Sequence, residues 1–270
     1  MGDHEGGLQA DIATLFERRQ LLRLFAAGAG LVVIGAACGS DKAATSPPST
    51  SGGSMASTAS SSASVTRIPE ETAGPYPGDG SNGVDVLTQA GIVRSDIRSS
   101  FGTASGVAPG VPLTIVLRVV DATTGSPRRG AAVYVWHCDR AGSYSMYSSA
   151  AKDQNYLRGV QETGVDGTVS FTSIYPACYS GRWPHIHFEV FPSLDAATSA
   201  GTRIATSQIA LTEDVSDTVY ATAGYEQSVR NLQQVSLATD NVFRDGATLE
   251  TPTVTGSMAS GFAVAMAVGV

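Results

Sequence analysis

Apolar and polar residues alternate along much of this chain, which is the pattern of half-buried β-strands. Between Val111 and Val120 every second residue is aliphatic, and these residues would share one face of a strand: Leu113, Ile115, Leu117 and Val119. The segment 121–127 then supplies turn residues, ending in Gly125, Ser126 and Pro127. Further strands are expected at Ala131–Cys138, Val169–Thr172, Ala205–Leu211 and in the apolar tail from about Thr251.

Helical periodicity is weak throughout, except around Tyr220–Leu232. Short strands separated by Gly, Pro and Asp favour an all-β fold, namely an antiparallel β-sandwich with few short helices. Residues 67–270 would form it, and roughly 200 residues are enough for one domain with a full core.

One expected strand carries candidate metal ligands. It follows Tyr179-Ser180-Gly181-Arg182-Trp183-Pro184 and reads His185-Ile186-His187-Phe188-Glu189-Val190. Alternate side chains of a strand share a face, so His185 and His187 would point one way, while the apolar alternates face the core. Neutral imidazole is the commonest metal ligand in proteins. The strand therefore predicts a site for an iron, copper or zinc ion.

The N-terminus has the features of an export signal. Arg18-Arg19 precede a short apolar run, Leu24–Ala37, and the pair suits twin-arginine export. Gly35-Ala36-Ala37-Cys38 resembles a bacterial lipobox, in which the cysteine is acylated; the alternative is an ordinary cleaved signal with an incidental cysteine. Residues 1–37 are thus expected to be the signal and residues 38–66, rich in Ser, Thr, Ala and Gly, a flexible tether. We expect the domain at the outer face of the cell membrane, held there only by the lipid, or secreted.

Charge narrows the class of partner. Without residues 1–37 the chain carries 14 Lys and Arg against 20 Asp and Glu, which argues against nucleic acid as a partner. Cys138 and Cys178 remain in the domain, and an exported protein can keep a disulfide. The sequence allows either a disulfide between Cys138 and Cys178 or two buried free thiols.

Two tyrosines lie near the candidate ligands in sequence. Tyr144 belongs to the turn Asp139–Ser145, and Tyr179 stands six residues before His185. Tyrosine, with an ordinary pKa near 10, is a rare ligand, but a hard trivalent cation can hold it as the phenolate. Ferric iron is the obvious candidate.

These segments together resemble the intradiol ring-cleavage dioxygenases, which include the protocatechuate 3,4-dioxygenases and the catechol 1,2-dioxygenases. The resemblance rests on the turn Gly142-Ser143-Tyr144-Ser145 and on Tyr179, Arg182, His185 and His187. The similarity runs from about Glu70, through Thr72-Ala73-Gly74-Pro75-Tyr76-Pro77, to Gly246.

The resemblance implies a ligand set and an activity. Tyr144, Tyr179, His185 and His187 would hold a non-haem Fe(III), and the chain would cleave a catechol with O2 to a cis,cis-muconate. Tyr179 would leave the metal and take a substrate proton, while Arg182 would stabilise negative charge on the ring. Gln208 would lie near the substrate, and Pro75 and Tyr76 would line the pocket.

Other interpretations compete with these. A surface-attached β-sandwich could bind another ligand and keep the cluster as a structural or remnant metal site. A zinc hydrolase would need a third histidine or a carboxylate near the pair, and Glu189 is one position too far along. His137 is expected to be a buried histidine with satisfied hydrogen bonds, or else to support a ligand. The sequence identifies neither the particular catechol that is the substrate nor the oligomeric state.

Overall fold

The computed structural model describes residues 64–270. The predicted signal at 1–37, the candidate acylation site Cys38 and nearly all of the tether lie outside the described residues. Within 64–270, none of the helices has the length and apolar character needed to cross a bilayer.

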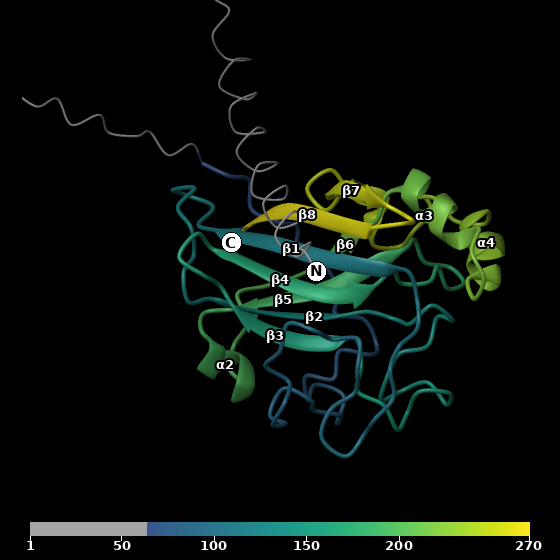
Figure 1. The fold of residues 1–270 in the computed structure, drawn as a ribbon. Coiled ribbons are helices and arrows are strands. Elements are labelled where there is room, and N and C mark those ends of the chain that lie inside the picture. The colour runs from purple at the N-terminus through teal and green to yellow at the C-terminus, as the bar shows by residue number, and fades with distance from the viewer. Residues whose placement is uncertain (1–63) are drawn as a thin grey trace, which may run out of the picture. The chain divides into compact units, whose positions relative to one another are not determined.

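Strands dominate the described part of the chain and form two four-stranded sheets (Figure 1). One sheet has the order β4-β1-β8-β7, with bounds Thr168–Ile174, Pro112–Val120, Gly261–Gly269 and Thr253–Ser257. The other has the order β3-β2-β5-β6, with bounds Arg158–Glu162, Ala132–Trp136, His185–Phe191 and Ala205–Ala210. Each strand predicted from alternation is present, with ends shifted by a few residues.

The sheets are not wholly antiparallel, which corrects the sequence prediction. Five of the six pairs between these strands are antiparallel, but β1 and β8 run parallel, with Leu113 opposite Phe262 and Val120 opposite Gly269. A parallel pair needs a long crossover connection, and β8 comes late enough in the chain for that. Alternation shows which residues share a face, but it does not show the direction of a strand's neighbour.

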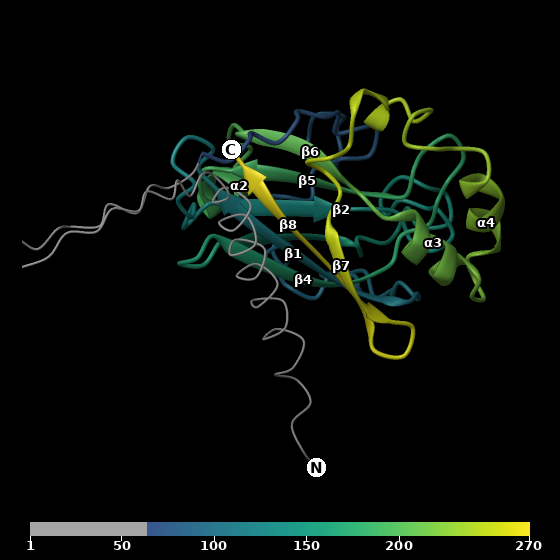
Figure 2. The same cartoon turned by 90° about the horizontal axis from the view of Figure 1, so that it is seen from above.

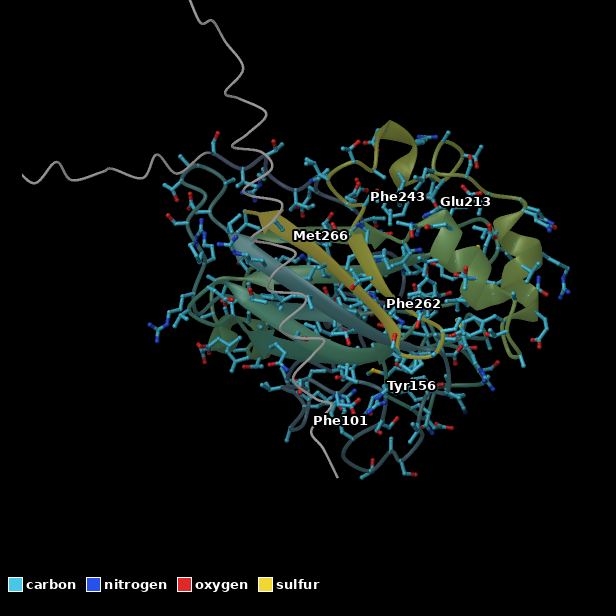
Figure 3. The ribbon with its side chains drawn as sticks, turned by 45° about the horizontal axis from the view of Figure 1, so that its top comes forward. Phe101, Tyr156, Glu213, Phe243, Phe262 and Met266 are labelled. Atoms are coloured by element: carbon cyan, nitrogen blue, oxygen red, sulfur yellow. The ribbon has the colours of Figure 1, made fainter. Side chains whose placement is uncertain are left out.

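One hydrophobic core takes side chains from both sheets. The alternate aliphatic residues of β1, from Leu113 to Val119, are buried in this core, and so are Ile186, Phe188 and Val190 of β5. Phe262 and Met266 of β8 and Phe243 join the same core (Figure 3). The opposite face of β5 is buried too, under a second cluster that includes Tyr134, Trp136 and Tyr144.

Among residues 64–270 the helices are few and short, as predicted. They are α2 (Leu194–Thr198), α3 (Glu213–Tyr220) and α4 (Glu226–Leu232), with a 3-10 turn at Phe243–Asp245. The helical signal at 220–232 corresponds to α4 only, because the chain turns between α3 and α4 and Gly224 there has φ +95°. Figures 1 and 2 show α3 and α4 together at one end of the sheets and α2 at the other.

Strand β3 was not predicted. It reads Arg158-Gly159-Val160-Gln161-Glu162, in which only one residue is a large apolar one. Its first three residues are nevertheless buried. Arg158 can be buried because its guanidinium N–H groups donate hydrogen bonds to buried oxygen atoms. A buried arginine breaks the apolar alternation on which the sequence prediction depends.

Candidate metal centre

Strand β5 presents both histidines to the same side. His187 lies between Trp136 of β2 and Gln208 of β6, and its ring stacks on that of Trp136 at 4.8 Å with an interplanar angle of 5°. Both histidines are 2% exposed. The register of three neighbouring strands therefore fixes the imidazoles, as expected for pre-organised ligands.

A turn brings the first tyrosine to them. Asp139 accepts hydrogen bonds from the backbone N–H groups of Ala141 and Ser143, both at 2.9 Å, and Gly142 has φ +86°. A Cβ on Gly142 would lie 3.3 Å from the Cβ of Tyr179. Glycine is required here for its positive φ and for the close approach of the loop that carries the second tyrosine.

Four side-chain atoms converge at the end of these elements. The Nε2 atom of His185 lies 3.1 Å from Nε2 of His187, 3.1 Å from the Tyr179 hydroxyl and 3.4 Å from the Tyr144 hydroxyl. The two tyrosine hydroxyls are 3.4 Å apart. The structure thus brings together all four residues predicted to be ligands.

Burial determines the protonation of this cluster. It lowers the pKa of His185 to about 3 and holds that of His187 well below its usual value, so both rings are neutral at pH 7. The Nδ1–H of His185 donates to the carbonyl of Trp183 at 2.5 Å, which leaves its Nε2 lone pair for the cluster. Burial also raises the pKa of Tyr179 to about 12 and that of Tyr144 well above 10. Only a strong Lewis acid would ionise these phenols at neutral pH.

The separations fit a common metal ion. Bonds of about 2.0–2.1 Å at angles of 90–120° place ligand atoms roughly 2.8–3.6 Å apart, which brackets the values above. Without a cation, two imidazole nitrogens face each other and Nδ1 of His187 is buried without a hydrogen-bond partner among the described residues. Phenolate oxygen is a hard donor, so the set suits ferric iron better than zinc.

No third histidine or carboxylate completes a zinc site. Within residues 64–270, no group of three or more His, Cys, Asp or Glu side chains is placed to hold a metal ion. Glu189 is fully buried but pairs with Arg203 at 3.1 Å. The structure therefore offers the zinc-hydrolase interpretation no ligand beyond the two histidines.

Arg182 and Gln208 lie together beside the histidines. Arg182 donates from Nη2 to the side-chain oxygen of Gln208 at 2.7 Å and from Nε to Asp240 at 2.9 Å. The amide of Gln208 in turn donates to the carbonyl of Thr72 at 2.8 Å. Among the described residues, Nη1 of Arg182 has no recorded hydrogen bond, and the side chain is 14% exposed. Nε and Nη2 of the guanidinium are therefore held by hydrogen bonds, and Nη1 is left to donate to a bound molecule.

Asp240, which holds Arg182, was missed from the sequence. It is fully buried, and its second oxygen accepts from the backbone N–H groups of Val242 and Phe243 at 2.8 and 3.2 Å. An aspartate whose side chain accepts from the backbone two and three residues further on is a common turn residue, and that signal was readable. Its pairing with an arginine 58 positions earlier was not.

The segment predicted to line the pocket does lie against the ligands. The Tyr76 ring is 4.9 Å from the Tyr144 ring and is 36% exposed. Gly74 has φ +68°, and a Cβ there would lie 3.4 Å from Cε1 of His187. Pro75 is exposed, and its carbonyl accepts from Asn82 at 2.7 Å.

Cys138 and Cys178 are not bridged, so the disulfide is absent from the structure. Cys138 packs in the second cluster with its thiol directed at the carbonyl of Ala177, whereas Cys178 packs in the shared core and directs its thiol at the carbonyl of Arg182. His137 is buried, with its nitrogens 2.8 Å from the Cys138 carbonyl and 2.7 Å from the Ser173 hydroxyl. It is the satisfied histidine that the sequence favoured.

Comparisons with known proteins agree with this geometry. Residues 94–214 match the family model described as "Dioxygenase", and this segment contains all four converging residues. A chlorocatechol 1,2-dioxygenase from Rhodococcus opacus is 44% identical over 57 residues, which span 21% of this chain and 22% of that protein. The structure is also similar to an intradiol ring-cleavage dioxygenase from Tetranychus urticae, with a TM-score of 0.59 and 24% identity over 76% of this chain and 94% of the other, so the fold is shared. Residues 94–214 therefore resemble the dioxygenase family, and the chain shares its fold with an intradiol ring-cleavage dioxygenase.

Proposed function

We propose that this protein is an Fe(III)-dependent dioxygenase that cleaves a catechol between its two hydroxylated carbons and yields a cis,cis-muconate. The observation that carries the proposal is the convergence of two neutral imidazole nitrogens and two phenol oxygens: Nε2 of His185 lies 3.1–3.4 Å from each of the other three atoms, and the two hydroxyls are 3.4 Å apart. Tyr144, Tyr179, His185 and His187 would hold the metal. When bound, it would supply the charge that ionises the phenols and the catechol and makes the ring reactive toward O2.

The two tyrosines are placed for different tasks. Tyr144 is 2% exposed and is hydrogen-bonded through its backbone N–H to the Ser148 side chain, so it is fixed. Tyr179 is partly exposed and sits in a loop between Cys178 and Gly181. Tyr179 is therefore the better candidate to move when a substrate enters and to take a proton from a substrate hydroxyl.

Arg182 would stabilise negative charge on the substrate ring. Its charge is held next to the histidines by Asp240 on one side and Gln208 on the other. A guanidinium with one nitrogen unengaged can donate to a developing oxyanion without reorganising, which is how fixed donors lower a barrier. Gln208 would act through Arg182 by fixing its orientation.

Oxygen uptake and product analysis test the proposal. The iron-loaded protein is expected to consume one O2 per catechol and to form a muconate. Arg182→Ala should keep the iron and lose about two to three orders of magnitude in kcat, the usual cost of removing one charge-stabilising donor. A wild-type protein that binds iron but consumes no O2 with any simple catechol would refute the assignment.

We also propose that the protein is exported and acylated at Cys38, so that its catechol is met outside the cytoplasm. The support is the twin-arginine and lipobox-like sequence at residues 18–38. Metabolic labelling with a radioactive fatty acid should mark the wild type and not Cys38→Ala. Equal labelling of both proteins would exclude this cysteine as the anchor.

A further inference from the structure

Arg158 is a fully buried cation without a counter-ion. It is 1% exposed and begins strand β3. Five carboxylate pairs occur among the described residues, and Arg158 takes part in none of them. Burying a charge is costly unless every donor finds a partner, so such a residue calls for a specific explanation.

Neutral oxygens satisfy all of its N–H groups. Nε donates to the Ser145 hydroxyl at 3.0 Å, and Nη1 donates to the Pro77 carbonyl at 2.8 Å and the Tyr134 hydroxyl at 2.9 Å. Nη2 donates to the carbonyls of Tyr76 at 2.9 Å and Ser145 at 3.1 Å. These five bonds use the full donor capacity of a guanidinium.

Four of the five bonds go to two segments that meet at the candidate metal centre, and the fifth goes to Tyr134 of β2. Tyr76 and Pro77 come from the segment that lies against the ligands, and Ser145 directly follows the ligand Tyr144. Nη2 alone spans the two segments, because its two hydrogens go to one carbonyl in each. Arg158 therefore connects the exposed Tyr76 ring to the backbone of the Tyr144 turn.

The turn that it holds is strained. Met146, next to Ser145, has φ +71°, a left-handed conformation that is unfavourable for a residue other than glycine. The Ser145 hydroxyl accepts from Arg158 and donates to the carbonyl of Tyr156 at 2.7 Å. A backbone turn with an unfavourable φ is maintained by the contacts around it. Loss of the Arg158 guanidinium should therefore let the turn relax and change the direction of the Tyr144 ring.

We propose that Arg158 is a positioning residue of the catalytic site, which fixes Tyr76 over Tyr144 and thereby sets both the fit of an aromatic substrate ring and the geometry of the Tyr144 phenolate. This inference rests on the proposed function. All five N–H groups of Arg158 are used by acceptors outside the ligand set, so its hydrogen bonds act on the site through the two tyrosines.

The test compares Arg158→Lys with a matched control, Arg94→Lys. Arg94 also donates to backbone carbonyls, those of Ser99, Asn155 and Arg158 itself, but not to Tyr76 or Tyr144. Arg94→Lys therefore disturbs the start of β3 while it leaves the Arg158 guanidinium and its acceptors in place. Lysine keeps the charge in both variants but cannot bridge two segments as a guanidinium does. The readouts are the visible tyrosinate-to-iron band and the Kd for 4-nitrocatechol without O2, each measured on iron-loaded full-length protein.

Arg158→Lys should shift the band and weaken 4-nitrocatechol binding about tenfold or more, as the loss of a charge-assisted hydrogen bond implies. Arg94→Lys should leave the band in place and the Kd within twofold. In Tyr76→Ala, adding Arg158→Lys should weaken binding much less than it does in the wild type, because the two residues act on one contact.

A second variant guards against misfolding of Arg158→Lys. Gly78→Ala keeps the arginine but places a Cβ 2.9 Å from Nη1, so it should displace the guanidinium and shift the band in the same direction. Because Gly78 has φ +67° and alanine is strained there, the urea midpoint of this variant is measured beside the band. If neither variant moves the band or the Kd, or if Arg94→Lys moves both equally, the inference is overturned. A wild type without a tyrosinate band would overturn the proposed function and this inference with it.

Discussion

Asp240 is expected to be the most sensitive single position near the site, and Asp240→Asn tests it with a minimal change of shape. The carboxylate is fully buried and accepts four hydrogen bonds. One oxygen takes the Nε–H of Arg182 at 2.9 Å and the backbone N–H of Trp183 at 2.7 Å, and the other takes the N–H groups of Val242 and Phe243. These donors hold the pKa of Asp240 below its usual 3.8, although burial alone would raise it.

The magnitude follows from the loss of one acceptor. Asparagine has a single acceptor oxygen, so in either orientation its NH2 group faces two N–H donors. Breaking a buried ion pair on one side costs about 3–5 kcal/mol. With a urea slope of about 2 kcal/mol per M, the midpoint of unfolding should fall by roughly 1.5–2.5 M. Arg182 loses its anchor as well, so kcat should fall with stability.

Urea denaturation of the metal-free protein at pH 7 measures the change. Asp96→Asn is the control, since Asp96 pairs with Arg98 at 2.6 Å in a half-exposed position. A surface pair contributes about 0–1 kcal/mol, so this midpoint should move by less than about 0.5 M. A similar small shift in Asp240→Asn would refute the assignment of Asp240 as the buried anchor of Arg182.

Three further predictions concern the metal-free domain and its ligands. Burial lowers the pKa of His137 to about 4, so unfolded chains take up protons first as the pH falls from 6.5. His137 alone should lower the free energy of unfolding by about 3 kcal/mol by pH 4, in addition to the loss from the buried His185 and His187. His137→Gln should remove this share and make the decline in urea midpoint shallower. Burial raises the pKa of Glu250 to about 8. Between pH 4.5 and 8 the unfolded chain has lost this proton while the folded protein still holds it, so the free energy of unfolding falls as the pH rises through this range. Glu250→Gln should therefore raise the urea midpoint at pH 8 and change it little at pH 5. Gly74→Ala, at φ +68° and against His187, should cost about 1–2 kcal/mol and weaken iron binding measured by competition with a chelator.

The histidine pair could be predicted because its signal is local. His185 and His187 are two residues apart, so strand geometry alone places them on one face. The turn around Gly142 is readable from Asp139 and the glycine, and Tyr144 follows it immediately. Local geometry therefore accounts for the two histidines, whereas the resemblance to the intradiol dioxygenases supplied the two tyrosines as candidate ligands.

The supports of the site could not be predicted, because their partners are far apart in sequence. Asp240 and Arg182 are 58 positions apart, and Arg158 meets the carbonyls of Pro77 and Tyr76 over 81 and 82 positions. No periodicity records such pairs. The parallel pairing of β1 with β8 was hidden for the same reason.

The visible spectrum of the iron-loaded protein, recorded without O2 before and after addition of catechol, tests the central claim most directly. If Tyr144 and Tyr179 hold Fe(III), the protein will be red-brown, with a broad charge-transfer band that shifts when catechol binds and that changes or disappears in Tyr144→Phe. A colourless protein that holds zinc, or no metal at all, would contradict the proposed metal centre.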